Sequence, residues 1–236
     1  MGAYTWSKFI EATSYLNEVD ENPERVNSDQ DRTHRLVASG IYELPFGRGK
    51  SLLRNANRAV NAVIGGWSLN SIYTYQSGEP FTIRSGFLTA NGSAQSRAAL
   101  APGVTELPKP QLQNKAGVLG PVFFPDASMF VNPGPGELGF GRNLFQGPTY
   151  WNVDLGISKG FQLSERFRLT FRTEMFNALN HANFRNPRDA SVGSPAINSN
   201  VFAQACCVSL STASSSTTNQ NGESWRVIQL ALKLAF

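Results

Sequence analysis

The chain has 236 residues, of which 41% are apolar and 16% are charged, and it contains 21 glycines and 13 prolines. This composition excludes a wholly disordered chain, and its low charge and many turn formers favour an all-β protein. The net charge of +4 is spread along the sequence without a basic block, so we expect no nucleic-acid partner. Since no segment reaches the roughly 18 to 20 apolar residues of a transmembrane helix, any membrane-spanning structure must be a β-barrel.

Alternation of apolar and polar residues predicts the first three strands in chain order. They are residues 2–10, "GAYTWSKFI"; residues 34–47, "HRLVASGIYELPFG"; and residues 67–78, "WSLNSIYTYQSG". In the third segment, Trp67, Leu69, Tyr73 and Tyr75 alternate with Ser68, Asn70, Thr74 and Gln76. A strand places these two sets on opposite faces, so each strand has one apolar and one polar side.

The clearest alternation lies between residues 150 and 176 and predicts a long hairpin with a tight turn at 164–166. Its apolar positions are Trp151, Val153, Leu155, Ile157, Phe167, Leu169, Phe171 and Met175. The intervening positions include Asp154, Arg168, Arg172 and Glu174, which we expect to line a water-filled lumen. Ion pairing on a solvated face and substrate selection are both open for these four residues.

The chain ends in "WRVIQLALKLAF", which predicts the last strand. Its apolar side carries Ile228, Leu230, Leu232, Leu234 and Phe236. Arg226, Gln229 and Lys233 also fit helical spacing, so these twelve residues alone are compatible with a helix. The strands predicted elsewhere favour a strand here too.

The connections alternate in length: 11–32 is long, 45–65 is shorter with a helical turn expected in "NRAVNAVIGG", 78–149 is long, 164–166 is tight and 178–223 is long. Long structureless loops are rare in compact soluble domains, whereas outer-membrane barrels combine short periplasmic turns with long extracellular loops. The fold expected is therefore an all-β, antiparallel up-and-down meander of about six long strands, a partial transmembrane β-barrel with long extracellular loops. A soluble β-sandwich with large insertions is the alternative.

A family resemblance supports the barrel. The segments "DRTHRLVASGIYELPFGRGK", "GGWSLNSIYTYQSGEPFTI" and "GRNLFQGPTYWNVDLGISKGFQLSERFRLTFRTEMFNALNHANF", followed by "RVIQLALKLAF", resemble the carboxy-terminal portion of TonB-dependent transporter-like outer-membrane proteins of the Oar-like group. The resemblance implies the outer membrane as location and membrane lipid as surroundings. It also implies that the barrel-assembly machinery recognises the terminal strand through Phe236, Leu234 and Leu232.

Such transporters have about 22 strands, an amino-terminal plug and a box that engages an inner-membrane energising complex. None of these parts is visible in residues 1–236, and six strands are fewer than the roughly eight of the smallest bacterial barrel. We therefore expect the chain to be the carboxy-terminal segment of a larger barrel, whose missing amino-terminal part contacts the energising complex. The resemblance implies energised uptake of a large substrate by the full-length parent, without catalysis. A structural or adhesion-type surface protein and a soluble β-rich binding module are the alternatives.

Several motifs are set aside. "PFGRGKS" lacks the first glycine of a phosphate-binding loop, because that position is Leu44, and "GPGELG" at 134–139 follows no strand. The two histidines, His34 and His181, have no second ligand at metal spacing, so we expect no metal, cofactor or catalytic site. The adjacent Cys206 and Cys207 are interpreted as loop residues, with a vicinal disulfide as the alternative.

Overall fold

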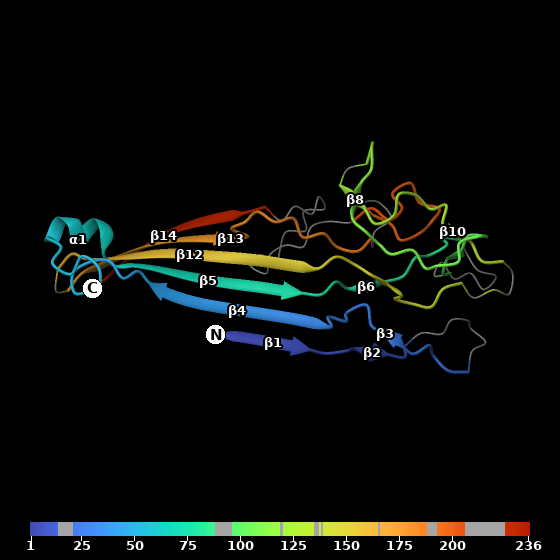
Figure 1. Cartoon of the computed structure of the whole chain (residues 1–236), viewed down its shortest axis with the longest axis horizontal. Coiled ribbons are helices and arrows are strands. Elements are labelled where there is room, and N and C mark those ends of the chain that lie inside the picture. The colour runs from blue at the N-terminus through green and yellow to red at the C-terminus, as the bar shows by residue number, and fades with distance from the viewer. Residues whose placement is uncertain are drawn as a thin grey trace.

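The computed structural model describes residues 1–13, 21–87, 96–118, 120–134, 137, 139–164, 166–187, 193–205 and 225–236. Its main element is a six-stranded sheet in the order β1-β4-β5-β12-β13-β14, in which all pairs are antiparallel (Figure 1). The strands are β1 (Gly2–Trp6), β4 (His34–Glu43), β5 (Trp67–Gln76), β12 (Tyr150–Gln162), β13 (Arg168–Phe176) and β14 (Val227–Ala235). The predicted up-and-down meander is confirmed, and the last twelve residues form a strand rather than a helix.

The strand register gives the sheet one apolar and one polar face. One apolar row crosses five strands through Tyr42, Leu69, Ile157, Thr173 and Leu230. The next row along the strands lies on the other face and runs through Glu43, Ser68, Ser158, Arg172 and Ala231. Because side chains alternate along every strand, this register separates most apolar from most polar positions. The exceptions include Ile41 and Ile72 on the polar face and Lys159 on the apolar face.

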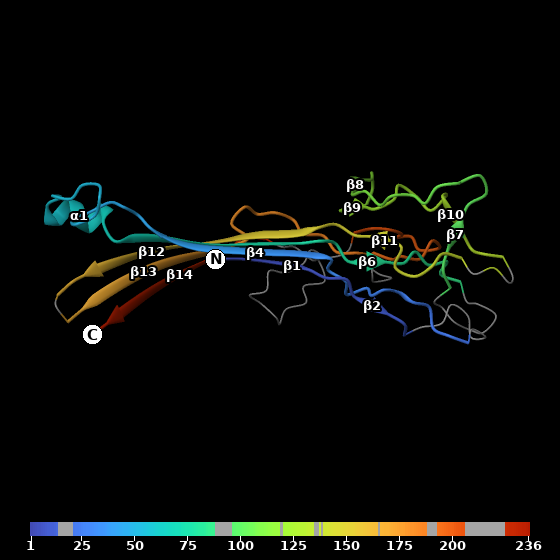
Figure 2. The ribbon, with the colours of Figure 1, turned by 60° about the horizontal axis from the view of Figure 1, so that its bottom comes forward.

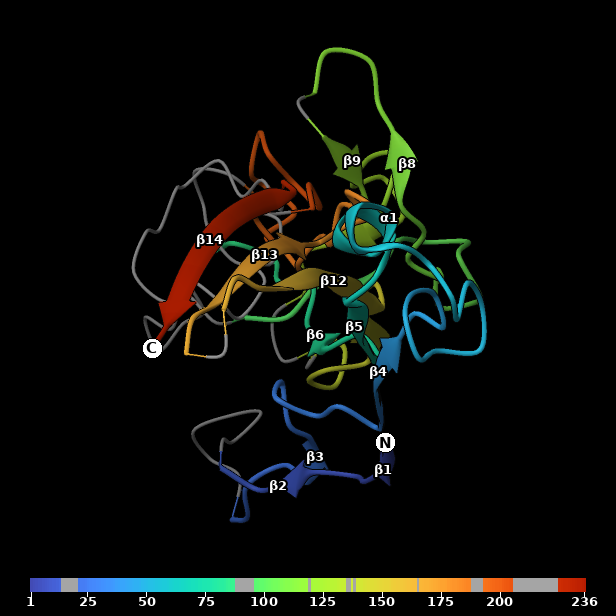
Figure 3. The same cartoon turned by 90° about the vertical axis from the view of Figure 1, so that its left-hand side faces the viewer.

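The sheet is curved and open. Seen along the strands, it forms an arc from β14 to β1, and the helix of residues 58–64 lies on the outer side of that arc (Figure 3). The view from the side shows the curvature of β12, β13 and β14 away from the helix (Figure 2). The two edges of this arc in the described part of the chain are β1 and β14.

The first strand is shorter than predicted. The expected strand covered residues 2–10, but β1 ends at Trp6, and Ile10–Glu11 forms β2, which pairs with β3 (Val26–Asn27). Hydrogen bonding explains the difference: the Phe9 amide donates to Asp31 Oδ1 at 2.8 Å, and the Ser28 amide donates to the Phe9 carbonyl at 2.9 Å. These bonds draw the chain away from β4 into a small hairpin.

One end of the sheet, here called the turn end, carries the two shorter connections, 44–66 and 163–167. The helical turn expected in the first of them is confirmed as α1 (Arg58–Ile64). Asn57 caps this helix, since its Oδ1 accepts a hydrogen bond from the Val60 amide at 2.8 Å. Gly66, with a φ of +73°, then turns the chain into β5.

The opposite end, the loop end, differs from the prediction. The connection 78–149, expected to be structureless, contains three short strand pairs: β6 (Pro80–Phe81) with β11 (Phe145–Gln146), β7 (Ala99–Leu100) with β10 (Phe130–Val131), and β8 (Gln113–Asn114) with β9 (Pro121–Val122). Together with the described residues between 177 and 205, they form one folded unit, here called the loop body (Figure 1). Tertiary contacts between aromatic residues, which have no local period, hold it together.

Candidate functional site: the two sheet faces and the loop body

The four residues predicted to share a water-filled face lie on the polar face of the sheet. On β13, Glu174, Arg172 and Arg168 lie opposite Gly156, Ser158 and Gln162 of β12. Asp154 is two residues before Gly156 on β12, so its side chain lies on the same face. Arg172 and Glu174 form an ion pair, and their side chains are 53% and 34% exposed. An exposed ion pair of this kind contributes little to stability. Because both side chains are exposed, their charges are accessible from the concave side of the sheet.

Asp154 has a different environment from the other three. It accepts hydrogen bonds from Asn152 Nδ2 at 2.7 Å and from the Asn177 amide at 2.9 Å. The second bond fixes the point where the chain leaves β13 for the loop body. Asp154 therefore stabilises the loop end, and only Arg172 and Glu174 of the four form a pair with each other.

Glycines make room on the polar face for longer side chains of the adjacent strand. A Cβ atom at Gly156 would lie 2.0 Å from Asn70 Oδ1, and one at Gly160 would lie 3.0 Å from a guanidinium nitrogen of Arg168. Asn70 and Arg168 thus lie flat across β12. This arrangement keeps these polar groups close to the sheet and leaves the space on its concave side open.

Lys159 is a charged residue on the otherwise apolar face, and the alternation alone gives no account of it. Its Nζ donates to the carbonyl oxygens of Val63 and Gly65 at 2.5 and 3.0 Å, and it lies 4.6 Å from the ring centroid of Trp67. Trp67 Nε1 also donates to the Val63 carbonyl, at 3.1 Å. Lys159 is 4% exposed, so the end of α1 and an aromatic ring shield its charge from the surroundings of the apolar face.

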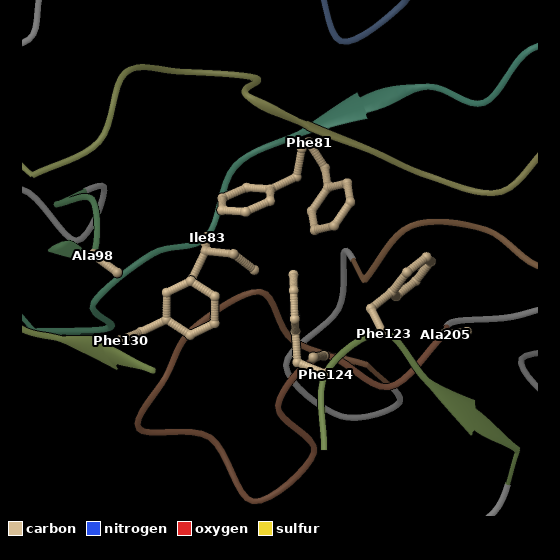
Figure 4. Packing of buried hydrophobic residues seen from close by; sticks show 9 residues of the cluster. Phe81, Ile83, Ala98, Phe123, Phe124, Phe130 and Ala205 are labelled. Atoms are coloured by element: carbon tan, nitrogen blue, oxygen red, sulfur yellow. The ribbon is translucent and has the colours of Figure 1, made fainter. Parts of the chain in front are cut away.

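A cluster of buried aromatic rings forms the core of the loop body (Figure 4). Its members come from two of the three long connections, 78–149 and 178–223: Phe81, Ile83, Ala98, Phe123, Phe124, Phe130, Phe145, Ala203 and Ala205. Phe145 is central, with ring centroids of four other phenylalanines between 5.6 and 6.0 Å away. Burial of several large rings stabilises a defined surface at this end of the sheet.

Ion pairs attach the first connection to the loop body. Arg97 pairs with Glu24 at 2.9 Å, and their side chains are 7% and 15% exposed. Arg142 pairs with Glu11 at 2.6 Å, and its amide donates to Glu24 at 3.2 Å. Because these charges are largely buried, loss of one partner would leave a costly unpaired charge. The connection between β1 and β4 is thus fixed to the other two.

The loop body carries a shallow cavity of about 140 Å³. Lys115, Asp126 and Gln204 contribute polar groups to its lining, and Val122 and Phe202 contribute apolar ones. Hydrogen bonds from the Ser128 side chain and amide, together with the charge of Lys115, lower the pKa of Asp126 below its usual 3.8. Asp126 is therefore a carboxylate at neutral pH.

An asparagine-rich turn joins β13 to the loop body. Asn177 Oδ1 accepts from the His181 amide and its Nδ2 donates to the His181 carbonyl, both at 2.9 Å. Asn183 makes the equivalent pair of bonds with the backbone of Trp151, also at 2.9 Å. Each of these asparagine side chains forms the two hydrogen bonds that a neighbouring strand would otherwise form with the backbone of His181 or Trp151.

The two histidines lie in separate surroundings. The His181 ring packs against Trp151 at an interplanar angle of 33°, with centroids 3.8 Å apart, whereas His34 Nδ1 hydrogen-bonds the Tyr4 hydroxyl at 2.8 Å. Within the described ranges, no three His, Cys, Asp or Glu side chains gather as a metal site. Cys206 and Cys207 lie outside the described residues, as do three residues of the "GPGELG" segment.

The terminal strand places Leu232 and Leu234 on the apolar face, where they are 68% and 51% exposed. Phe236 follows β14 at the turn end and is 94% exposed. Other exposed apolar side chains on this face are Tyr4, Trp6, Tyr42, Leu69, Ile228 and Leu230. A face with so many exposed apolar groups is suited to an apolar surrounding. In the described segments, no helix combines the length and the apolar character required to cross a membrane.

A curved antiparallel sheet with an apolar outer face, a polar inner face, short turns at one end and long connections at the other defines the wall of an outer-membrane β-barrel. The family model described as "Outer membrane beta barrel domain" matches residues 1–229. The chain therefore belongs to the outer membrane beta barrel domain family, and its location is the outer membrane of Gram-negative bacteria. No curated protein and no solved structure matches it.

Proposed function

We propose that this chain is the barrel wall of a TonB-dependent, Oar-like transporter or receptor. In this proposal the polar face lines the lumen, the loop end is extracellular and the turn end is periplasmic. Transport of a large substrate is energised from the inner membrane, through a part of the protein outside residues 1–236. The proposal includes no catalytic step and no cofactor.

The resemblance of the strand series to Oar-like barrels carries the transport part of this proposal. The structure adds support at the polar face, where Arg172 and Glu174 are accessible and Asn70 and Arg168 lie flat against the wall. A wall of this kind leaves the lumen free for a plug or a passing substrate. Assembly of the barrel through Phe236, Leu234 and Leu232 by the barrel-assembly machinery belongs to the same proposal.

The loop body favours a second candidate function, that of a structural or adhesion-type surface protein. Its aromatic core and its buried ion pairs with the first connection fix one surface at the loop end. A pre-organised surface binds with a smaller entropic cost than flexible loops do. The third alternative, a soluble binding module, disagrees with the family membership.

Uptake by cells tests the two candidates. Cells that express the full-length protein are compared with and without the inner-membrane energising complex, using fluorescently labelled oligosaccharides and peptides that are too large for porins. Energised transport predicts that accumulation stops without the complex while surface binding continues. Surface binding with no accumulation in either strain would contradict transport and support adhesion.

A further inference from the structure

Residues 45–66, all but the first residue of the connection between β4 and β5, combine positive charge with exposed apolar groups and are here called the rim segment. It contains four basic residues and no acidic one. The basic residues are Arg48, Lys50, Arg54 and Arg58, all exposed. Among the described residues only Lys50 of these four forms an ion pair, with Glu43 at 2.7 Å. The segment thus presents a positive surface.

Apolar side chains of the rim segment are exposed beside these charges. Val63 is 69% exposed, Leu53 56%, Leu52 48%, Val60 41% and Phe46 38%. Val60 and Val63 are three residues apart on α1 and therefore lie on the same side of the helix. A basic segment with an apolar side is the pattern of peptide segments that lie in a membrane interface.

The position of the rim segment places this surface next to the lipid-facing side of the sheet. Lys159 and Trp67, both on the apolar face, bind the carbonyl oxygens at the end of α1. The helix accordingly lies on the outer side of the arc, beside the turn end of the strands (Figures 2 and 3). In a membrane-spanning sheet this is the level of the lipid headgroups.

We propose that the rim segment binds anionic phospholipid headgroups at the turn end of the barrel. Arg48, Arg54 and Arg58 contact the phosphates, while Val60 and Val63 enter the boundary between headgroups and acyl chains. Continuity with the apolar face and the absence of acidic residues favour lipid over a protein partner. Lys159 holds the segment in place, which makes it a positioning residue.

The test uses the full chain in vesicles of phosphatidylcholine, with and without phosphatidylglycerol. A fluorescent probe is attached to a Val63→Cys variant in which Cys206 and Cys207 are replaced by serine. With phosphatidylglycerol present, the probe should be quenched by lipids that carry a shallow nitroxide and protected from aqueous iodide. Arg54→Gln/Arg58→Gln should shift the equilibrium towards iodide access by about thirtyfold. The matched control Lys109→Gln/Lys115→Gln, which removes the same charge from the loop body, should have no effect.

A second probe distinguishes lipid contact of the rim segment from lipid contact of the sheet. A probe at Ile157, on the apolar face two residues from Lys159 along β12, reports whether the sheet itself is in lipid. Lipid quenching at Ile157 with free iodide access at Val63 in both vesicle types would overturn the rim-segment proposal alone. Protection of Val63 from both quenchers would overturn it in favour of a protein contact. Iodide access at both positions would contradict the membrane orientation of the sheet.

Discussion

The loop body should depend on the ring of Phe145. This side chain is 2% exposed and has Phe81, Phe124, Phe130 and Phe140 around it, three of them edge-on at interplanar angles of 80° to 88°. Phe145→Ala removes all four contacts and leaves a cavity, and such a truncation costs about 3 to 5 kcal/mol. A loss of about 3 kcal/mol raises the population of the opened loop body more than about hundredfold.

Native-state proteolysis of the reconstituted protein measures this opening, because cleavage tracks the open population when closing is fast. Phe87→Ala is the matched control, since Phe87 belongs to the same unit but is 49% exposed. We expect cleavage between residues 96 and 134 to accelerate strongly in the first variant and by less than about threefold in the control. Equal cleavage rates for the two variants would refute the aromatic core as the source of the loop body's stability.

Three further predictions concern other parts of the molecule. Lys159→Met should release α1 and expose residues 45–66 to protease added at the turn end, while Lys233→Met on the polar face should not. Mass spectrometry of the cleavage products measures this, and unchanged protection in Lys159→Met would contradict the role of Lys159 as the anchor of α1. The lowered pKa of Asp126 means that its carboxylate stabilises the loop body above pH 3.8 and that this stabilisation is lost as the pH falls below 3.8. Asp126→Asn should remove this pH-dependent part of the stability. Identical melting curves for the wild type and the variant at each pH from about 5 to about 3 would argue against it. Protease added to intact cells that express the full-length protein should cleave within 178–223 but not at 164–166, and the reverse pattern would mean that the topology is inverted.

The sequence allowed the faces of the sheet to be predicted but not the details at its ends. Arg172 and Leu69 were assigned correctly, because a period of two fixes the side of every residue once one face is apolar. The four polar candidates were predicted as one group, yet Asp154 is held by Asn152 and Asn177 near the loop end. The different environment of Asp154 depends on its position along the strand, and the alternation of apolar and polar residues gives no information about that position.

The loop body and the Lys159 anchor could not be predicted in this way. Phe81, Phe124 and Phe145 are far apart in the sequence and are surrounded by turn formers, so no local pattern links them. A signal existed in the number of phenylalanines within residues expected to be solvated loops, because solvated loops rarely carry so many large apolar groups. For Lys159, the contacts with the end of α1 and with the Trp67 ring explain a charge on the apolar face.

In the membrane, we expect the apolar face of the sheet to meet lipid and the polar face to meet water. Two identical substitutions on opposite faces test it: Ile157→Arg, in the apolar row with Leu69 and Thr173, and Ile72→Arg, on the polar face directly opposite Asp154. The measurement is the free energy of unfolding from lipid bilayers of the full-length protein. We expect Ile157→Arg to cost clearly more than Ile72→Arg, with about 2 to 4 kcal/mol as the cost at the bilayer centre, because the guanidinium introduced at position 72 lies in water near the Asp154 carboxylate. Equal losses for the two variants, or a larger loss for Ile72→Arg, would contradict the orientation of the sheet in the membrane.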